Sequence, residues 1–172
     1  IILTLPPAYE NYKRYFDATW LHGSSLSNPY FLALQFLKSQ GNYNETVLEI
    51  PAKNVDATKK DVLRWYELST PAIVVFANKR GYLNNEYIDF AGVNVVPRID
   101  FIRKVILFNK MSIDDSFEYI KLKEEIKQGL KDNEIVFIYS PYPLLSFEKM
   151  NFISKVYKNR VANIYRVEYK NY

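Results

Sequence analysis

Short apolar segments of strand length alternate along this chain with longer segments of helical periodicity, and this alternation limits the possible folds most strongly. The segment 135–139 is apolar throughout, as a buried strand would be. The segment before it has the apolar stripe of an amphipathic helix, formed by Tyr119, Leu122, Ile126 and Leu130. Strands that alternate with helices tend to pair in parallel, with the helices covering the faces of the sheet. The pattern therefore predicts an α/β fold.

The expected sheet is mixed and ends in a hairpin. Its strands are expected near residues 46–50, 72–77, 104–108, 135–139 and 161–169. A short strand at 155–158 should pair with the last of these across a two-residue turn, Asn159-Arg160. We expect a single domain over residues 1–172, in which a partly parallel sheet is flanked by helices and closed by a C-terminal antiparallel hairpin. An N-terminal helix and loop over residues 1–28 should lead into it, and residues 87–96 should be extended.

Two further helices are expected from their capping residues. Asn28 precedes Pro29, which suits a helix that starts there and runs to about Ser39. Asp56 is expected to cap a helix that runs to about Leu68.

The composition provides little material for catalysis or for metal binding. The chain has 172 residues, no cysteine and one histidine, which excludes disulfides and thiolate metal sites. The adjacent acids Asp114-Asp115 suit a helix start better than a metal site. The single His22 lies in a loop with several serines, which favours an ordinary loop histidine over a catalytic base. The glycines are scattered, so no phosphate loop and no cofactor are expected.

A mild positive charge leaves nucleic acid as an alternative partner. The net charge is +4 with a pI near 9.0, but the 23 basic residues are interspersed with 19 acidic ones. This distribution favours a solvated surface over a stripe that follows phosphates, so nucleic acid is not the expected partner. A basic α/β module that binds nucleic acid is kept as the alternative function, and a small independent enzyme built on His22 ranks behind it.

The loop after the expected strand 72–77 is the first candidate for a binding surface. In open α/β sheets, ligands bind beyond the carboxyl ends of the strands. Asn78, Lys79, Arg80 and Tyr82 would lie there and offer polar, cationic and aromatic side chains. Asn44 begins the sequon Asn44-Glu45-Thr46 in a polar turn, so it is the expected glycosylation site and indicates an external location.

The last third of the chain has the most specific pattern. Residues 152–159 read Phe-Ile-Ser-Lys-Val-Tyr-Lys-Asn and continue after Arg160 into Val-Ala-Asn-Ile-Tyr-Arg-Val at 161–167. This ending, with the helix-then-strand order of 30–50 and 65–77, resembles the C-terminal extracytoplasmic domain of multi-spanning glycosyltransferases. These are the lipid-sugar-dependent enzymes of the GT-C or dolichol-phosphate-mannose type. The resemblance covers roughly residues 30–169, and Arg160 stands where that ending usually has glycine.

The resemblance implies an accessory domain on the outer face of a membrane, with a role in acceptor binding or assembly. The catalytic acids of that class lie in loops between membrane helices, so the resemblance assigns no catalytic residue to this chain. It implies two partners, the upstream transmembrane region of the same protein and a glycan or protein acceptor. No apolar run here approaches the ~20 residues that span a bilayer. We therefore expect the parent protein to continue before Ile1 into several hydrophobic helices.

Overall fold

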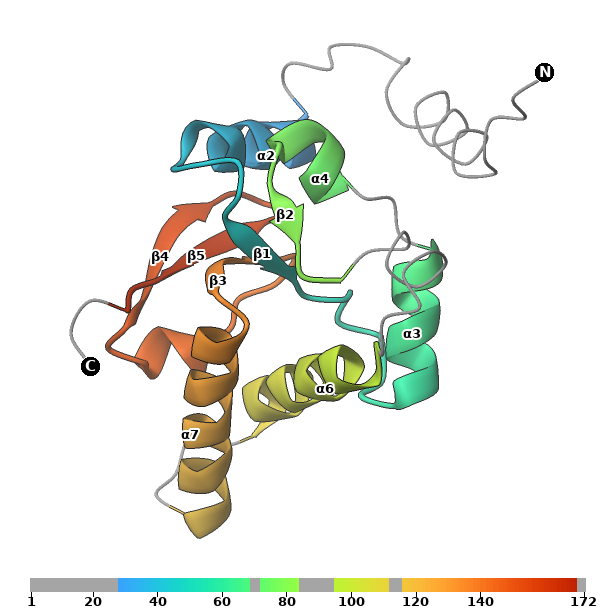
Figure 1. Ribbon diagram of the computed structural model, residues 1–172, viewed down its shortest axis with the longest axis vertical. Coiled ribbons are helices and arrows are strands. Elements are labelled where there is room, and N and C mark those ends of the chain that lie inside the picture. Colours follow the sequence, from blue (N-terminus) through green and yellow to red (C-terminus); the bar gives the residue numbers. More distant parts are fainter. Residues whose placement is uncertain (1–27, 69–71, 84–94, 112–115, 170–172) are drawn as a thin grey trace.

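The computed structural model describes residues 28–68, 72–83, 95–111 and 116–169, and the fold is α/β (Figure 1). Its sheet has five strands in the order β2-β1-β3-β5-β4. The strands are β1 (Thr46–Glu49), β2 (Arg80–Gly81), β3 (Ile135–Ser140), β4 (Ile153–Lys158) and β5 (Asn163–Val167). β1 pairs in parallel with β2 and with β3, whereas β5 is antiparallel to β3 and to β4. The expected mixed, partly parallel sheet and its C-terminal hairpin are thus confirmed.

Helices cover both faces of the sheet (Figure 1). One face packs on α2 (Pro29–Ser39) and α4 (Ala72–Ala77), and the other on α3 (Lys59–Leu68), α6 (Val96–Lys110) and α7 (Phe117–Asp132). Side chains of β1 alternate between the two layers, so that Val47 is buried with α2 and α4 and Leu48 with α3, α6 and α7. The parallel strands are therefore buried on both faces, as such strands usually are.

The segment 72–77 is a helix, so the strand expected there was wrong. Its sequence, Ala-Ile-Val-Val-Phe-Ala, is rich in β-branched residues. A short apolar run has no periodicity that separates a buried strand from a buried helix. As a helix, α4 buries Ile73 and Ala77 in the same cluster as Leu34 and Leu37 of α2. This packing outweighs a helix propensity penalty of less than ~1 kcal/mol per residue.

The strand expected at 104–108 was also wrong, because these residues belong to the long helix α6. The buried positions of α6 include Ile99, Ile102, Val105 and Ile106, which follow helical spacing. Pro97 lies in its first turn, where proline is common.

The hairpin turn is longer than the two residues expected. It spans residues 159–162, and the Asn159 side-chain Oδ1 accepts hydrogen bonds from the main-chain N–H groups of Val161 and Ala162, both at 2.9 Å. In such a turn the asparagine side chain replaces a main-chain hydrogen-bond acceptor, so no residue has to adopt a left-handed conformation. Arg160 is not among the described residues with positive φ, so this turn does not require glycine at that position.

The helix start near residue 56 is shifted by two residues. Thr58, not Asp56, caps α3: its hydroxyl accepts from the N–H of Asp61 at 3.1 Å and donates to the Asp61 carboxylate at 2.6 Å. Asn28 caps α2 as expected, with its side chain accepting from Tyr30 N at 2.9 Å.

Some expectations fall outside the described residues. These are the N-terminal helix, the His22 loop, most of the extended segment at 87–96, and Asp114-Asp115. Val96 at the end of that extended segment begins α6 instead. Within the described ranges, no helix combines the length and the apolar character that crossing a membrane requires.

Candidate ligand-binding site

The strand order reverses direction at β1. From β1 the chain passes to β2 on one side and later crosses to β3 on the other side. When successive connections leave a strand in opposite directions, a crevice forms beyond the carboxyl ends of the two strands, and open α/β sheets bind ligands there. In this chain the crevice is expected where the segments after Glu49 and Ser140 leave the sheet.

A cavity of about 420 Å³ lies where those segments meet the end of α6. It is lined by Lys53, Asn109, Lys110, Tyr142, Pro143 and Leu145. Lys53 follows β1, and the residues from 142 onward follow β3. Its volume falls within the ~300–1,000 Å³ typical of small-molecule sites. We call it the switch-point cavity.

The segment after β3 is held in place by side chains of the sheet. The Ser140 hydroxyl donates to the main-chain carbonyl of Tyr142 at 2.6 Å. The buried hydroxyl of Tyr165, on β5, accepts from Leu144 N at 2.8 Å and donates to the Glu148 carboxylate at 3.0 Å. Glu148 also forms an ion pair with Lys155 of β4 at 2.5 Å. The wall of the cavity that carries Tyr142 is therefore fixed to the antiparallel half of the sheet.

Glu49, the last residue of β1, is a carboxyl group in an unusual environment. Burial raises its pKa to about 8, so it is largely protonated at neutral pH. No described residue forms a hydrogen bond or an ion pair with its carboxyl group. Titratable groups with strongly shifted pKa values are concentrated at functional sites, which makes Glu49 a candidate.

Three tyrosines surround this end of β1. Tyr66 of α3 donates its hydroxyl to the main-chain carbonyl of Glu49. Burial raises the pKa of Tyr66 well above its ordinary value, and the charges of Glu49, Tyr82 and Tyr142 raise it further. Burial also raises the pKa of Tyr142, which lines the switch-point cavity. Tyr142 thus links the cavity to the buried group around Glu49.

The described residues of this site are suited to binding and offer no complete catalytic set. The Ser140 hydroxyl is buried and bonded to the main chain, so no base is placed to activate it. No group of three metal-ligating side chains occurs in the part of the chain that the structure describes. A protonated Glu49, by contrast, is a hydrogen-bond donor at neutral pH.

The loop predicted from the sequence does not lie at the carboxyl end of a strand. It follows helix α4 and enters β2, because 72–77 is not a strand. Lys79 is only 3% exposed, and its Nζ donates to Asn42 O at 2.7 Å, to Glu45 Oε2 at 2.8 Å and to the carbonyl of Gln40. It closes the carboxyl end of α2, which is a structural role.

The other three predicted residues of that loop lie in different environments. Asn78 is exposed and ends α4 with a left-handed φ of 51°. Arg80 and Tyr82 help line a polar cavity of about 220 Å³ that also contains Arg98, Asp132 and Glu134. Arg80 Nη2 donates to Thr46 Oγ1 at 2.7 Å and lies 3.5 Å from the Glu134 carboxylate. The structure thus joins two of the four predicted residues in one cavity, and their binding role stays a prediction.

The predicted glycosylation sequon is split between exposed and buried positions. Asn44 is exposed in the turn before β1. Thr46 is only 3% exposed, and its hydroxyl accepts two hydrogen bonds from Arg80, at 3.0 and 2.7 Å.

Sequence reasoning missed Glu49 and the cavity, although one signal was present. An acid directly after the apolar residues Val47 and Leu48, and before Ile50, is unusual for a buried parallel strand. The part of the cavity formed by Asn109 and Lys110 could not be predicted, because these residues were expected after a strand at 104–108 and not at the end of a helix.

Comparisons with protein-family models, with curated proteins and with solved structures find no match to this chain. No relative therefore supplies a ligand for the switch-point cavity or a role for Glu49.

Proposed function

We propose that this chain is a non-catalytic extracytoplasmic domain of a membrane glycosyltransferase-like protein and that it binds part of a glycan acceptor in the switch-point cavity. The sequence pattern from Phe152 to Val167 supports the class of protein. The single observation that carries the binding role is the cavity of about 420 Å³ beyond the carboxyl ends of β1 and β3.

The lining of the cavity suits a sugar. A sugar ring has an apolar face that packs on aromatic side chains, and hydroxyl groups around its edge that need hydrogen-bond partners. Tyr142, Pro143 and Leu145 offer an apolar wall, and Asn109 and the two lysines offer polar groups. Sites of this kind combine a mainly apolar lining with a few placed polar groups.

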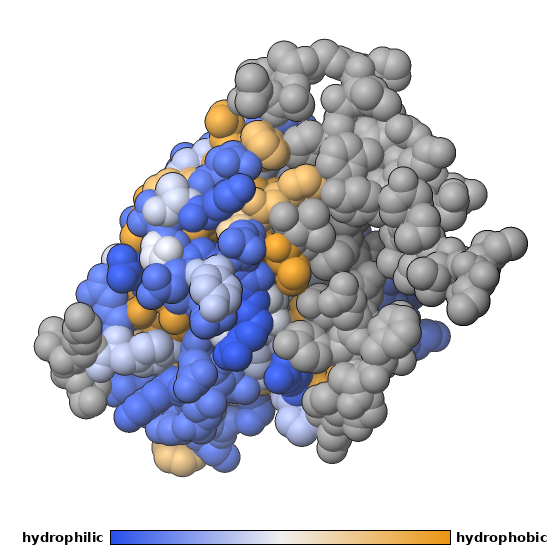
Figure 2. All heavy atoms as spheres, turned by 45° about the horizontal axis from the view of Figure 1, so that its top comes forward, coloured by the Kyte–Doolittle hydropathy of each residue, from blue (hydrophilic) through white to orange (hydrophobic). Residues whose placement is uncertain are grey.

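The surface does not favour the alternative, nucleic-acid binding. Several lysines of the described part of the chain are neutralised by acids, among them Lys59 by Asp100 at 3.1 Å and Lys104 by Glu125 at 2.7 Å. Figure 2 shows hydrophilic and hydrophobic side chains interspersed over the described part of the face in view. Binding to a nucleic acid would depend steeply on salt, because counterions are released.

A ligand titration of the 172-residue chain tests the binding role. Isotope-labelled protein is titrated with a panel of neutral and acidic mono- and oligosaccharides, and amide chemical shifts are followed. We expect shifts clustered at Lys53, Lys110 and Leu145, and their loss in Tyr142→Ala. Tyr43→Ala is the matched control, because Tyr43 is 67% exposed in the turn before β1 and does not line the cavity. The same chain should show no turnover of nucleotide sugars or lipid-linked sugars.

Three results would contradict the proposal. The first is no shift with any sugar at millimolar concentration, and the second is shifts that survive Tyr142→Ala unchanged. The third concerns the parent protein: if its sequence before Ile1 contained no stretch of about 20 apolar residues, the membrane assignment would fail. Salt-sensitive binding to single-stranded nucleic acid would support the alternative instead.

A further inference from the structure

We propose that the ligand of the switch-point cavity is an acidic glycan, which places a carboxylate or phosphate group between Lys53 and Lys110. This inference rests on the proposed function and specifies its ligand class. The cavity is lined by two lysines and by no acidic residue. A ligand with a negative charge would complement this lining.

The two lysines of the cavity carry charges that no described acid compensates. Neither Lys53 nor Lys110 forms an ion pair or hydrogen bond with another described residue. Lys79, Lys104 and Lys155, by contrast, lie within 2.8 Å of a carboxylate oxygen. Two unpaired cations that converge on one cavity raise the local affinity for an anion.

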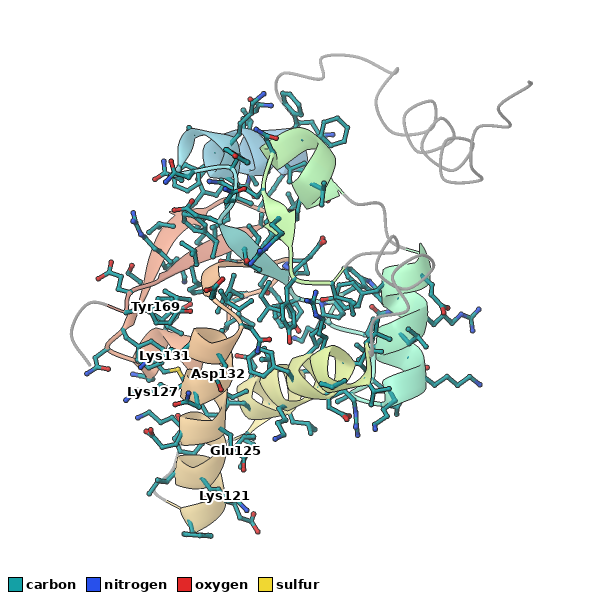
Figure 3. The ribbon with its side chains drawn as sticks, in the orientation of Figure 1. Lys121, Glu125, Lys127, Lys131, Asp132 and Tyr169 are labelled. Carbon is teal, nitrogen blue, oxygen red and sulfur yellow. The ribbon has the colours of Figure 1, made fainter. Side chains whose placement is uncertain are left out.

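Two other cavities among the described residues have balanced charges, which makes the contrast informative. A cavity of about 230 Å³ beside α7 is lined by Lys127 and Lys131 but also by Glu124 and Glu168. Figure 3 shows Lys127 and Lys131 along α7 toward Tyr169. The polar cavity at Arg80 and Arg98 likewise contains two acids. The lining of the switch-point cavity alone among these three has an uncompensated charge.

The remaining walls indicate that the anion belongs to a larger, hydroxylated molecule. Asn109 lines the cavity and brings a carboxamide, a group that can both donate hydrogen bonds to sugar hydroxyls and accept them. Tyr142 and Leu145 supply the apolar wall on which a ring can pack. Inorganic phosphate uses only the lysines and should bind more weakly.

The test compares three sugars that share a ring and differ in charge: glucose, glucuronate and glucose 6-phosphate. Binding is followed by amide chemical shifts at constant ionic strength. We expect both acidic sugars to bind more tightly than glucose, and inorganic phosphate to bind more weakly than glucose 6-phosphate. Replacing both lysines, in Lys53→Gln with Lys110→Gln, should weaken acidic sugars about 2- to 30-fold, since exposed ion pairs contribute ~0.2–1 kcal/mol each. Binding of glucose should be unchanged.

The matched control is Lys38→Gln with Lys60→Gln, which removes the same charge from exposed lysines outside the cavity. It should leave all affinities unchanged. A preference for glucuronate over the phosphate would identify the acid as a carboxylate, and the reverse preference as a phosphate.

The acidic-glycan inference fails if glucose binds as tightly as the acidic sugars, or if the control lowers affinity as much as the cavity variant. In either case the proposed glycan-binding function stands. Binding of inorganic phosphate as tightly as glucose 6-phosphate would also overturn the inference, because the sugar ring would then contribute nothing. If no sugar binds at all, the proposed function itself fails.

Discussion

Glu49 is the last residue of β1, a position at which a buried strand would ordinarily have an apolar residue. It follows Thr46, Val47 and Leu48, which are at most 3% exposed, on a strand with neighbours on both sides. An ionised carboxylate in such a position is costly unless it is paired, so the group stays protonated to a higher pH instead. A residue that lowers stability in this way is typical of a site with a function other than folding.

The first prediction is that Glu49→Gln stabilises the protein at alkaline pH. Burial raises the folded-state pKa of Glu49 to about 8 from its ordinary value of 4.5. Between these values the folded protein holds a proton that the unfolded chain has lost, so stability falls as pH rises. The penalty is absent below about pH 4.5 and complete above about pH 8, at ~1.4 kcal/mol per pKa unit. Glutamine mimics the protonated form and removes this pH dependence.

The measurement is the free energy of unfolding by urea at pH 5, 7 and 9 for both proteins. The advantage of Glu49→Gln should grow by on the order of 4 kcal/mol between pH 5 and pH 9. Glu118→Gln, at an exposed position in the first turn of α7, should show no such trend. A constant difference between wild type and Glu49→Gln at all three pH values would contradict the assigned pKa.

At the scale of elements, local signals placed the start of α2 correctly and the start of α3 two residues too early. Asp56 and Thr58 are both acceptable caps, and the sequence alone does not rank them. The structure selects Thr58 because its hydroxyl reaches the N–H and the carboxylate of Asp61, three residues along. This spacing is that of a capping box, with aspartate in place of the usual glutamate.

The second prediction separates the two capping residues. Thr58→Ala should lower the free energy of unfolding by about 1 kcal/mol, because the first turn of α3 loses its hydrogen-bond acceptor. Asp56→Ala, a matched removal of a polar side chain two residues earlier, should change it by less than about 0.5 kcal/mol. Both are measured by urea denaturation followed by circular dichroism. A larger loss for Asp56→Ala would show that the helix starts where the sequence first indicated.

The sequence predicted correctly those segments whose own apolar pattern and whose flanking segments indicate the same secondary structure. The strand near 135–139 was expected from its continuous apolar run, and the helix before it from an apolar stripe at helical spacing. Both are present, as β3 and α7. The errors arose at 72–77 and 104–108, where short apolar runs fit a strand and a helix equally well. For 104–108, the helical period lies in buried residues outside that short segment. Ile102 lies one turn before Val105 and Ile106, and Ile99 lies two turns before them.

At the scale of the whole molecule, the candidate site depends on three segments that are distant in sequence. The switch-point cavity joins Lys53, Lys110 and Tyr142, and their meeting follows from the strand order β2-β1-β3. A sequence reading that takes α6 for a strand cannot produce this order. The rule that ligands bind at carboxyl ends was applied to residues 78–82, whose preceding element is a helix and not a strand.

The third prediction concerns the sequon and depends on the complete fold. Thr46 is buried in β1 and bonded to Arg80, so an enzyme that must bind both Asn44 and Thr46 reaches only the exposed Asn44 in the folded chain. We expect an oligosaccharyltransferase to modify a synthetic peptide of residues 40–50 but not the folded protein. The measurement is the mass increase of each substrate in one reaction. Efficient modification of the folded chain would show that the edge strand β2 opens readily.

Helix α4 has a consequence for the chain before it folds. Its six residues are apolar and uncharged, contain no proline or glycine, and include three β-branched side chains. Segments of this kind stack readily into cross-β fibrils when their backbone is exposed. In the native protein the segment is a short helix that buries Ile73 and Ala77 in one cluster with Leu34 and Leu37 of α2. We therefore expect substitutions that loosen the docking of α4 on α2 to raise the tendency of the chain to form fibrils.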